Sequence, residues 1–408
     1  MNCRFCKHTL SHEFVDLFNS PPSNSFLSKE ELSGSETYFP LKLNVCENCF
    51  LVQVDEYKKA GDIFNSDYIY FSSYSKSWLT HASAYVDKMM NTFRLNSDSL
   101  VVEIASNDGY LLQYFKIKGV QVLGIEPTHN TAAVARKKGI ESITEFFGER
   151  FASKLSRENR KADLLLGNNV LAHVPDINDF VKGLKIALKP DGIITMEFPH
   201  LMQLIENNQF DTIYHEHFSY LSFSTVSLIF EAQELRMFDV EEISTHGGSL
   251  RIYAKHAEDN TRHISSRVRD LLEKEEKMGL KNLEYYKGFS NRVNKVKWNL
   301  LQFLIDQKCS GNRIVAYGAA AKGNTLLNYC GIKPDLVDFV VDASPHKQGK
   351  FLPGSHIPVL QEEEIRRTKP EFILILPWNI QEEIKEQLSY IREWNARFVV
   401  AIPELLIL

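Results

Sequence analysis

The sequence predicts an α/β protein in which two folds of alternating strands and helices follow a small cysteine domain. Three observations lead to this prediction. Two C-x-x-C pairs lie in the first 50 residues. A strand, a turn and a helix are followed by a second strand that ends in an acidic residue, and this pattern occurs twice, in the middle of the chain and near its end. A length of 408 residues also exceeds one ordinary core, so two or three domains are expected.

Composition restricts the classes of partner. Lys and Arg number 47 against 52 Asp and Glu, and the net charge of -5 gives no overall attraction to nucleic acid or anionic membrane. No apolar run approaches the roughly 18 residues of a membrane span. The start, MNCRFCKH, lacks the apolar core of a secretory signal. We therefore expect a cytoplasmic protein that acts on a small substrate, with neither nucleic acid nor membrane as partner.

The cysteine pairs predict a structural zinc site. Two residues between ligands let both thiolates of a pair reach one tetrahedral Zn²⁺. A redox C-x-x-C would need a strand before it, whereas the first pair stands at the chain start. Nearby His8 and His12 could replace a cysteine, but we expect them to face solvent. The predicted metal ligands are Cys3, Cys6, Cys46 and Cys49.

The stretch SLVVEIASNDGYLLQYFKIKGVQVLGIEP, residues 99–127, predicts the central nucleotide-binding turn. A buried strand ends in SNDG, a helix follows, and the next strand ends at Glu126, where a carboxylate accepts hydrogen bonds from ribose. The G-x-G-x-x-G that a pyrophosphate needs is absent, and an acidic turn suits a cationic sulfonium. S-adenosylmethionine is therefore favoured over a dinucleotide. The predicted cofactor residues here are Glu103, Ala105, Asn107, Asp108, Gly109, Glu126 and Pro127.

The next strands extend this cofactor fold. ADLLLGNNVLAHVPD predicts a strand that runs into a loop, and LKPDG before the following strand is typical of class I methyltransferases. Asn168, Asn169 and His173 would line the cofactor mouth at the carboxyl end of a strand. Alternatively, His173 only binds the following loop, and the two asparagines only close the turn.

YHEHFSYLS, residues 214–222, is the most polar and aromatic stretch of the chain. In a strand, Tyr214 and His217 would lie on opposite faces; in a helix they would share one. The zincin spacing is absent, so an acid/base centre is favoured over a metal site. Such a centre needs one imidazole, a carboxylate that fixes its tautomer and phenols that donate hydrogen bonds, and the stretch contains all three. A polar strand packed under another domain is the structural alternative.

Five motifs in this order resemble the nucleotide-sugar C-methyltransferases: the cysteine pairs, EIASNDG, YHEHFSYLS, THGGSLRIYA and YGAAAKGNTLLN. The resemblance covers nearly the full chain. It implies a cytosolic enzyme that methylates a nucleoside-diphosphate 4-keto-6-deoxyhexose at the carbon next to the ketone. It also implies that His217 is the catalytic base, with Tyr214, Glu216 and Tyr70 in the catalytic site. Tyr68 and His215 would contact the sugar. Tyr68 and Tyr70 belong to DYIYFSSYSKSW, which resembles the family's lid, although packing of the small domain onto the large one is the alternative for both.

The last hundred residues predict a second Rossmann-like domain. YGAAAKGN offers small residues at a helix N-terminus, where backbone N–H groups can hold a phosphate. We expect this domain to hold the nucleotide sugar, although a purely structural role is the alternative. HGGSLRIYA would bridge the two halves of the cleft, unless its glycines only form a bulge. The predicted substrate residues are Gly318, Lys322, Asn324, Asp342 and Lys347.

These inferences divide the chain into four segments. They are a zinc-binding domain (1–75), an S-adenosylmethionine-binding domain (76–258), a charged helical linker (259–308) and the C-terminal Rossmann-like domain (309–408). Two other functions remain open from the sequence. One is a zinc-containing RNA methyltransferase, and the other is a nucleotide-sugar binding protein without catalytic activity. Neither the hexose, the methylated position nor the oligomeric state follows from the sequence.

Overall fold

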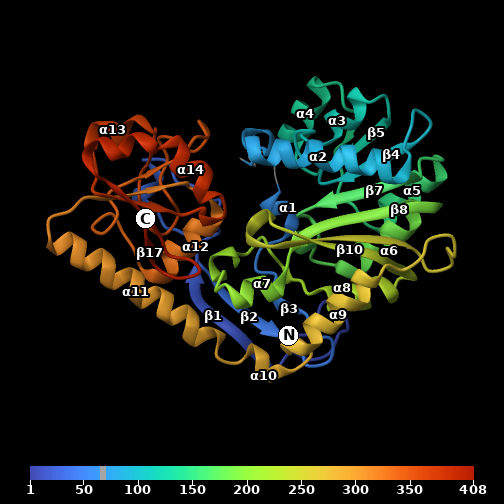
Figure 1. Cartoon of the computed structure of the whole chain (residues 1–408), viewed down its shortest axis with the longest axis horizontal. Coiled ribbons are helices and arrows are strands. Elements are labelled where there is room, and N and C mark those ends of the chain that lie inside the picture. The colour runs from blue at the N-terminus through green and yellow to red at the C-terminus, as the bar shows by residue number, and fades with distance from the viewer. Residues whose placement is uncertain (65–69) are drawn as a thin grey trace.

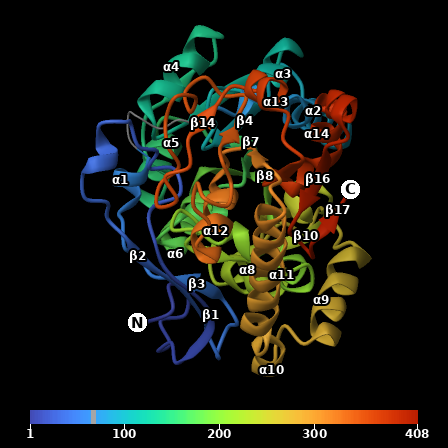
Figure 2. The same ribbon diagram turned by 90° about the vertical axis from the view of Figure 1, so that its left-hand side faces the viewer.

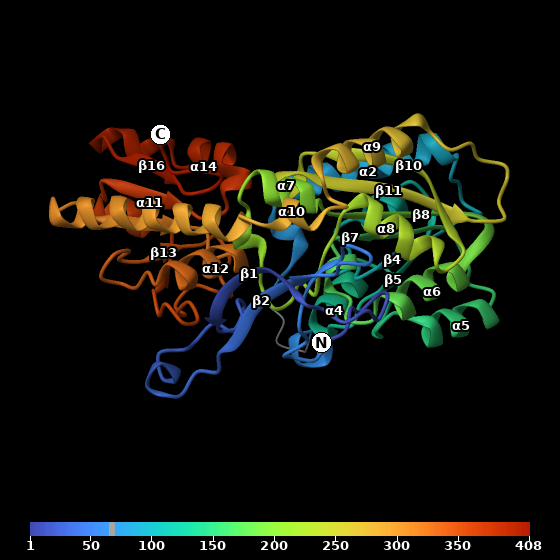
Figure 3. The same cartoon turned by 90° about the horizontal axis from the view of Figure 1, so that it is seen from below.

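Three β-sheets form the framework of the chain (Figure 1). The structure is a computed structural model that describes residues 1–64 and 70–408. The first sheet belongs mainly to the N-terminal segment, the second to the middle and the third to the C-terminal segment. The two larger sheets form separate lobes, and the N-terminal strands lie at the junction between them (Figures 1 and 3).

The N-terminal sheet is antiparallel, in the order β1-β2-β3-β9. Its last strand comes from the middle of the chain, because Tyr220 pairs with Val52 and Ser219 with Gln53. The segment YHEHFSYLS is thereby attached to the N-terminal domain. The elements are β1 (His12–Ser20), β2 (Phe39–Val45), β3 (Val52–Val54), α1 (Ala60–Ile63) and β9 (Ser219–Tyr220).

The central sheet has the order β10-β11-β8-β7-β4-β5-β6. Strands β4 to β8 run parallel, whereas β11 runs antiparallel to both its neighbours. Continuous apolar strands such as LVVEI result from burial on both faces. The strands are β4 (Leu100–Ile104), β5 (Gln121–Ile125), β6 (Ser142–Ile143), β7 (Ala162–Asn168), β8 (Leu188–Pro199), β10 (Leu235–Ile243) and β11 (Ser249–His256).

Helices cover both faces of the central sheet. Side chains of α2 and α3 pack on one face, and those of α5, α6 and α8 pack on the other. None of the described helices is both long and apolar enough to cross a lipid bilayer. The helices are α2 (Lys76–Phe93), α3 (Leu112–Ile117), α4 (His129–Lys137), α5 (Glu149–Arg157), α6 (Ile177–Ala187), α7 (Leu201–Glu206) and α8 (Phe223–Glu231).

The C-terminal sheet has the order β14-β13-β12-β15-β16-β17, parallel except for β17. The charged stretch before it is helical, as its period predicts, and α11 and α12 lie on one side of this sheet (Figure 2). The elements are α9 (Ser266–Met278), α10 (Leu283–Tyr286), α11 (Phe289–Cys309), β12 (Ile314–Tyr317), α12 (Ala321–Cys330), β13 (Val340–Val341), β14 (Val359–Leu360), α13 (Glu363–Thr368), β15 (Phe372–Ile375), α14 (Gln381–Gln387), β16 (Arg397–Val400) and β17 (Leu406–Ile407).

The N-terminal sheet and the C-terminal domain share one apolar core. Leu43 of β2, Phe289 of α11 and Leu327 of α12 belong to it. Polar contacts add to this junction: Asn324 Nδ2 of α12 donates to the Ser23 carbonyl at 2.6 Å, and Thr325 Oγ1 donates to the Ile213 carbonyl at 2.8 Å. The start of α12 is thereby held directly beside the segment YHEHFSYLS.

Candidate active site

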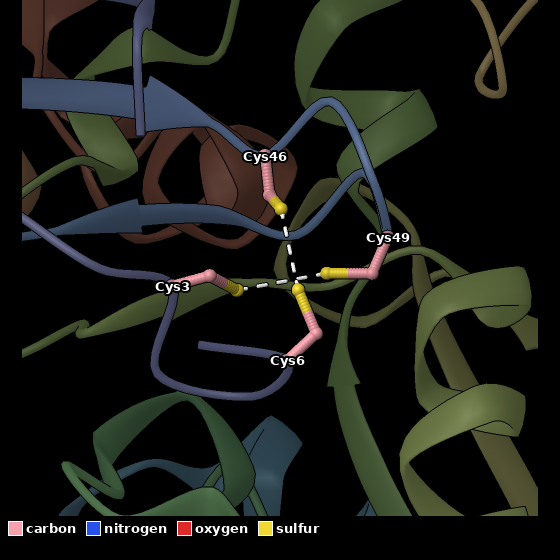
Figure 4. Close-up of side chains that lie close together, drawn as sticks. All are labelled: Cys3, Cys6, Cys46 and Cys49. Atoms are coloured by element: carbon pink, nitrogen blue, oxygen red, sulfur yellow. Dashed lines mark hydrogen bonds between the residues drawn. The ribbon is translucent and has the colours of Figure 1, made fainter. Parts of the chain in front are cut away.

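The four predicted zinc ligands lie together and point toward one another (Figure 4). All four sulfur atoms lie within 4.8 Å of one another, with Cys3 and Cys49 3.6 Å apart and Cys6 and Cys46 3.5 Å apart. A tetrahedral zinc with Zn–S bonds of about 2.3 Å separates its sulfurs by about 3.8 Å, so the cluster fits this ion.

The zinc site is closed by protein groups, as a structural site requires. Gln53 Nε2 donates to Cys3 Sγ at 3.3 Å, which supports the thiolate form. His8 and His12 are exposed and both bind the Glu47 carboxylate, at 2.8 and 2.7 Å, so they face solvent as expected. Four sulfurs leave no coordination position for a substrate. The zinc therefore holds the N-terminal domain together.

The central turn is shaped for close approach of a ligand. Ala105, Asn107 and Gly109 all have positive φ angles, of 56°, 49° and 75°. Such a backbone points successive N–H groups in unusual directions. Glu126, at the end of β5, fixes the turn by accepting from Asn107 N at 2.8 Å and from Thr128 N at 2.9 Å. Pro127 follows, half-buried, at the rim. Thr128 Oγ1 also donates to Oε1, so Oε2, which accepts from Asn107 N, keeps a second lone pair for a ribose hydroxyl.

Buried polar atoms without a partner among the described residues gather at this turn. They include both carboxylate oxygens of Glu103, Ser106 Oγ, Asp108 Oδ1 and both amide atoms of Asn168. Burial, with Glu126 and Asp108 nearby, raises the pKa of Glu103 well above its ordinary value. Three carboxylates in one buried turn repel one another, and a cationic ligand relieves that repulsion. The residues therefore fit S-adenosylmethionine, whose sulfonium and ammonium groups are positive.

Aromatic side chains line the mouth of this turn. Trp78 of α2 stacks on His81, with ring centroids 4.9 Å apart, and contacts Tyr110 at 5.9 Å and His246 at 5.2 Å. Asn169 Nδ2 donates to His246 Nε2 at 2.9 Å, so this asparagine orients a histidine from the connection between β10 and β11. Sequence reasoning missed Trp78, because an aromatic residue at helical spacing is indistinguishable from a core residue.

YHEHFSYLS begins as a turn rather than as a strand. The His217 N–H donates to the Tyr214 carbonyl at 3.0 Å, which closes the turn and places both side chains on one side. His217 Nδ1 lies 3.0 Å from the Thr212 carbonyl, and Nε2 lies 2.8 Å from the Tyr214 hydroxyl. A carbonyl only accepts, so Nδ1 carries the proton and Nε2 accepts from Tyr214.

His217 is held as a neutral imidazole. Burial lowers its pKa well below 6.5, and His173, His246 and Lys322 add to this effect. The His173 and His217 rings meet edge to face at 4.6 Å. Burial also lowers the pKa of His173 to about 4. The structure thus places His173, which was predicted at the cofactor mouth, against the candidate base.

The other two polar residues of the turn face the N-terminal domain. Glu216 Oε1 accepts from Asn24 Nδ2 at 2.7 Å, and burial raises the pKa of Glu216 to about 7. His215 Nε2 lies 3.2 Å from the Pro40 carbonyl, and its ring packs edge-on against Phe39. The described contacts of both residues are therefore with the N-terminal domain rather than with His217.

The two predicted lid tyrosines differ in what can be said of them. Tyr68 lies outside the described residues. Tyr70 is described: its carbonyl accepts from Asn107 Nδ2 at 3.1 Å, and its side chain is 49% exposed. The Asn107 Oδ1 accepts from Ser72 N at 2.9 Å. The Asn107 side chain therefore binds the segment that follows Tyr70, while its backbone belongs to the cofactor turn.

The C-terminal turn follows β12 and opens α12. Gly318 has a φ of 91°, and a Cβ there would lie 2.5 Å from Pro377 Cδ, so only glycine fits. Asp342, after β13, accepts from Ala319 N at 2.8 Å and from Ser344 N at 2.8 Å. Lys347 Nζ donates to the Ala319 carbonyl at 2.9 Å. Gly318, Asp342 and Lys347 are thus grouped around one turn, as predicted, whereas Asn324 binds Ser23.

Lys322 points to the other side of β12. Its Nζ donates to Asn379 Oδ1 at 2.6 Å and lies 4.6 Å from the centre of the Trp378 ring. Trp378 Nε1 donates in turn to Asp211 Oδ2 at 2.7 Å. Burial raises the pKa of Asp211 to about 6, which the charge of Lys322 opposes. A half-buried lysine, a half-buried tryptophan and a buried aspartate from two domains thus form one group.

The motif HGGSLRIYA contacts this group, as the bridging prediction requires. A Cβ at Gly247 would lie 2.3 Å from an atom of the Trp378 ring, so only glycine permits this approach. Arg251 does not bridge the lobes; it binds Glu197 of β8 at 2.6 Å within the central sheet. The first half of the motif therefore joins the domains, and the second half belongs to the sheet.

Three family models match successive parts of the chain. A zinc binding domain of methyltransferases matches residues 3–64, a methyltransferase domain matches residues 78–240, and a C-methyltransferase C-terminal domain matches residues 244–403. C-methyltransferase NovU of Streptomyces niveus is 34% identical over 402 residues, which cover 98% of this chain and 95% of that protein.

Solved structures resemble part of the chain. The PH0226 protein of Pyrococcus horikoshii is 17% identical, with a TM-score of 0.38, over 46% of this chain and 94% of its own. Magnesium protoporphyrin IX methyltransferase of Synechocystis, solved with bound S-adenosylmethionine, is 14% identical, with a TM-score of 0.34, over 43% of this chain and 78% of its own.

The seven-stranded sheet, its acidic turn and the matched methyltransferase domain define a class I methyltransferase that depends on S-adenosylmethionine. The chain belongs to the C-methyltransferase family that includes NovU, because it is 34% identical to that protein over nearly its full length. The predicted α/β fold, the cofactor and the structural zinc are thereby confirmed.

Proposed function

We propose that this C-methyltransferase acts on a nucleoside-diphosphate 4-keto-6-deoxyhexose and methylates the carbon next to the ketone. One observation carries the proposal. His217, whose imidazole is neutral, contacts His173 of the central domain, and Ile213, shortly before it, accepts a hydrogen bond from Thr325 of the C-terminal domain. The resemblance of five motifs to nucleotide-sugar C-methyltransferases supports the choice of substrate.

Methylation of carbon requires a base. S-adenosylmethionine, when bound, supplies an electrophilic methyl group, which a sugar carbon attacks only as an enolate. A neighbouring ketone makes the α-proton acidic enough for removal, and a positioned side chain must accept that proton. His217 meets this requirement because Thr212 fixes the proton on Nδ1 and leaves the lone pair on Nε2. Its lowered pKa keeps Nε2 unprotonated at neutral pH.

Tyr214 controls access to this lone pair. Its hydroxyl donates to Nε2 at 2.8 Å, so it stands where the α-hydrogen must come. Substrate binding therefore displaces the phenol from Nε2. Burial raises the pKa of Tyr214 well above 10, which keeps the phenol protonated throughout. The displaced hydroxyl can then donate to another oxygen of the sugar, and Glu216, protonated in part near neutral pH, can bind a sugar hydroxyl.

The nucleotide end of the substrate belongs to the C-terminal turn. Backbone N–H groups at the start of α12 and the ammonium of Lys347 favour the diphosphate. Asp342 Oδ1, which accepts from Ser344 N, keeps a second lone pair that is suited to a ribose hydroxyl. The cofactor turn and this turn would therefore hold the two reactants from opposite sides of His217.

The test is a substrate panel. The purified protein is incubated with S-adenosylmethionine and dTDP-, GDP- and CDP-linked 4-keto-6-deoxy sugars, and the products are analysed by mass spectrometry. We expect at least one sugar nucleotide to gain one methyl group. Absence of product across the panel, with the cofactor bound, contradicts the proposal. Salt-dependent RNA binding would instead support the RNA methyltransferase named above.

A further inference from the structure

The proposed reaction needs a second group that the sequence did not identify. As the α-proton leaves, negative charge develops on the ketone oxygen, and a hydrogen-bond donor must stabilise it. In the proposed reaction the Tyr214 phenol, once displaced from His217, donates to another oxygen of the sugar. Glu216 accepts from Asn24, and with a pKa of about 7 it is ionised in part, so its negative charge would oppose that of the oxyanion. The donor must therefore come from another element that faces His217.

Lys322 is placed for this task. It lies in the first turn of α12, whose next residues bind the segment before Tyr214 through Thr325 and Ile213. The charge of Lys322 acts on both His217 and His246, where it adds to the effect of burial in lowering the pKa. The Trp378 ring that Lys322 contacts lies against Gly247 and binds Asp211, the residue before Thr212, whose carbonyl binds His217.

The strand order separates Lys322 from the nucleotide turn. β12 lies between β13 and β15 in the C-terminal sheet. Lys347 and Asp342 follow β13 and bind Ala319, whereas Lys322 binds Asn379, which follows β15. The two lysines therefore stand on opposite sides of the turn. Only Lys347 lies where a diphosphate would meet Ala319 and the start of α12.

The neighbours of Lys322 position its ammonium group but do not accept all of its hydrogen bonds. An ammonium has three N–H groups, and the described residues accept one hydrogen bond, through Asn379 Oδ1 at 2.6 Å. Trp378 contributes a ring face at 4.6 Å. Burial lowers the pKa of Lys322, and the charge of Asp211 opposes this change. Two N–H groups of a half-buried cation thus remain for a ligand.

We propose that Lys322 is a catalytic residue that donates a hydrogen bond to the ketone oxygen of the sugar, and that it does not bind the diphosphate. This inference rests on the proposed function. The α C–H bond breaks, its proton passes to His217 Nε2, and its electron pair forms the C=C bond of the enolate. The carbonyl π pair moves to the oxygen beside Lys322. In the second step this pair re-forms the C=O bond. The C=C electron pair then forms the C–C bond to the methyl group while the S–CH₃ bond breaks.

The experiment separates proton removal from nucleotide binding. The full-length protein with S-adenosylhomocysteine is mixed with a 4-keto-6-deoxy sugar nucleotide in D₂O, so that exchange at the α-carbon occurs without methyl transfer. For Lys322→Met we expect the exchange rate at saturating substrate to fall by about 100-fold, which is the usual cost of one oxyanion donor. The Kd of the free nucleoside diphosphate, measured by calorimetry, should stay within about threefold. Lys295→Met, on the exposed side of α11, is the matched control.

Each other result overturns the inference. A nucleoside diphosphate Kd weakened about tenfold or more would show that Lys322 binds the diphosphate, whether or not exchange also falls. An exchange rate within about threefold of the wild type would show that another group binds the oxygen. If Lys322→Met fails to bind S-adenosylmethionine, Lys322→Gln is tested against the same thresholds. No exchange by the wild type on any sugar nucleotide would instead contradict the proposed function.

Discussion

The central turn and the C-terminal turn share one backbone plan. They differ in charge and in whether their buried polar atoms have hydrogen-bond partners. Both join a buried strand to a helix, and in both an acidic residue from the next strand binds the turn: Glu126 binds Asn107 N, and Asp342 binds Ala319 N. The central turn contains further buried carboxylates, with Glu103 and Asp108 retaining atoms that lack partners. The C-terminal turn has small residues instead, with Lys347 beside it.

The difference shows how one fold binds ligands of opposite charge. An acidic residue at the end of the second strand serves ribose in either case, so it does not discriminate between ligands. The side chains of the turn itself do: carboxylates without partners favour a cation, and backbone N–H groups with a lysine favour an anion. The comparison therefore predicts that each turn can be disabled without loss of the other.

The largest expected effect is at the central turn. Glu126→Ala removes the acceptor that fixes Asn107 and the proposed acceptor for ribose, so we expect the Kd of S-adenosylmethionine to rise by about 100-fold, as for two lost charged hydrogen bonds. Calorimetric titration measures it. The Kd of the nucleoside diphosphate should not change. Equal losses of both ligands would show that the turns are not independent.

A smaller effect is expected at the C-terminal turn. Lys347→Met removes one charge beside Ala319, and we expect the Kd of the nucleoside diphosphate to rise by about tenfold, less at high salt because ions screen the interaction. S-adenosylmethionine serves as the internal control, since its Kd should stay the same. Unchanged nucleotide affinity at low salt would refute the role of Lys347.

The smallest expected effect is the release of protons when the cofactor binds. Burial raises the pKa of Glu103 well above its ordinary value, and a bound cation lowers that pKa again. Binding of S-adenosylmethionine should therefore release protons at pH values between the pKa of Glu103 with and without the cofactor, and its affinity should rise as pH increases through that range. Titrations in two buffers of different ionisation enthalpy measure the release.

Glu103→Gln is the control for this effect, because an amide cannot titrate. The pH dependence of S-adenosylmethionine binding should then be lost. The nucleoside diphosphate should show no release that depends on Glu103. Proton uptake rather than release on cofactor binding would mean that the turn does not use its carboxylates against a cation.

Local patterns made much of this predictable. Short segments of sequence predict the cysteine pairs, the strand that contains Glu103 and the acidic residue after β5. The structure has each of them where it was expected. Contacts between residues far apart in the sequence could not be predicted. Asn24 reaches Glu216 across 192 residues, and Trp378 reaches Asp211 across 167. No periodicity or spacing signals such contacts, because they depend on how the domains pack.

The histidine segment shows the same limit. Its composition indicated an acid/base centre, but alternation could not decide which residues face one another. In the turn closed by Tyr214 and His217, the phenol donates to the imidazole, whereas Glu216 accepts from Asn24 of the N-terminal domain. The partner that fixes the tautomer is the Thr212 carbonyl, not a carboxylate as the sequence suggested, and a backbone group leaves no signal in the side chains.

The central claim is that His217 removes the α-proton of the sugar. The most direct measurement is deuterium incorporation at the α-carbon in D₂O by His217→Asn, together with single-turnover methyl transfer. Both rates should fall by about 100-fold or more, as expected for loss of a general base, while the Kd values of both ligands stay within about threefold. Exchange and methylation at the wild-type rate would contradict the account.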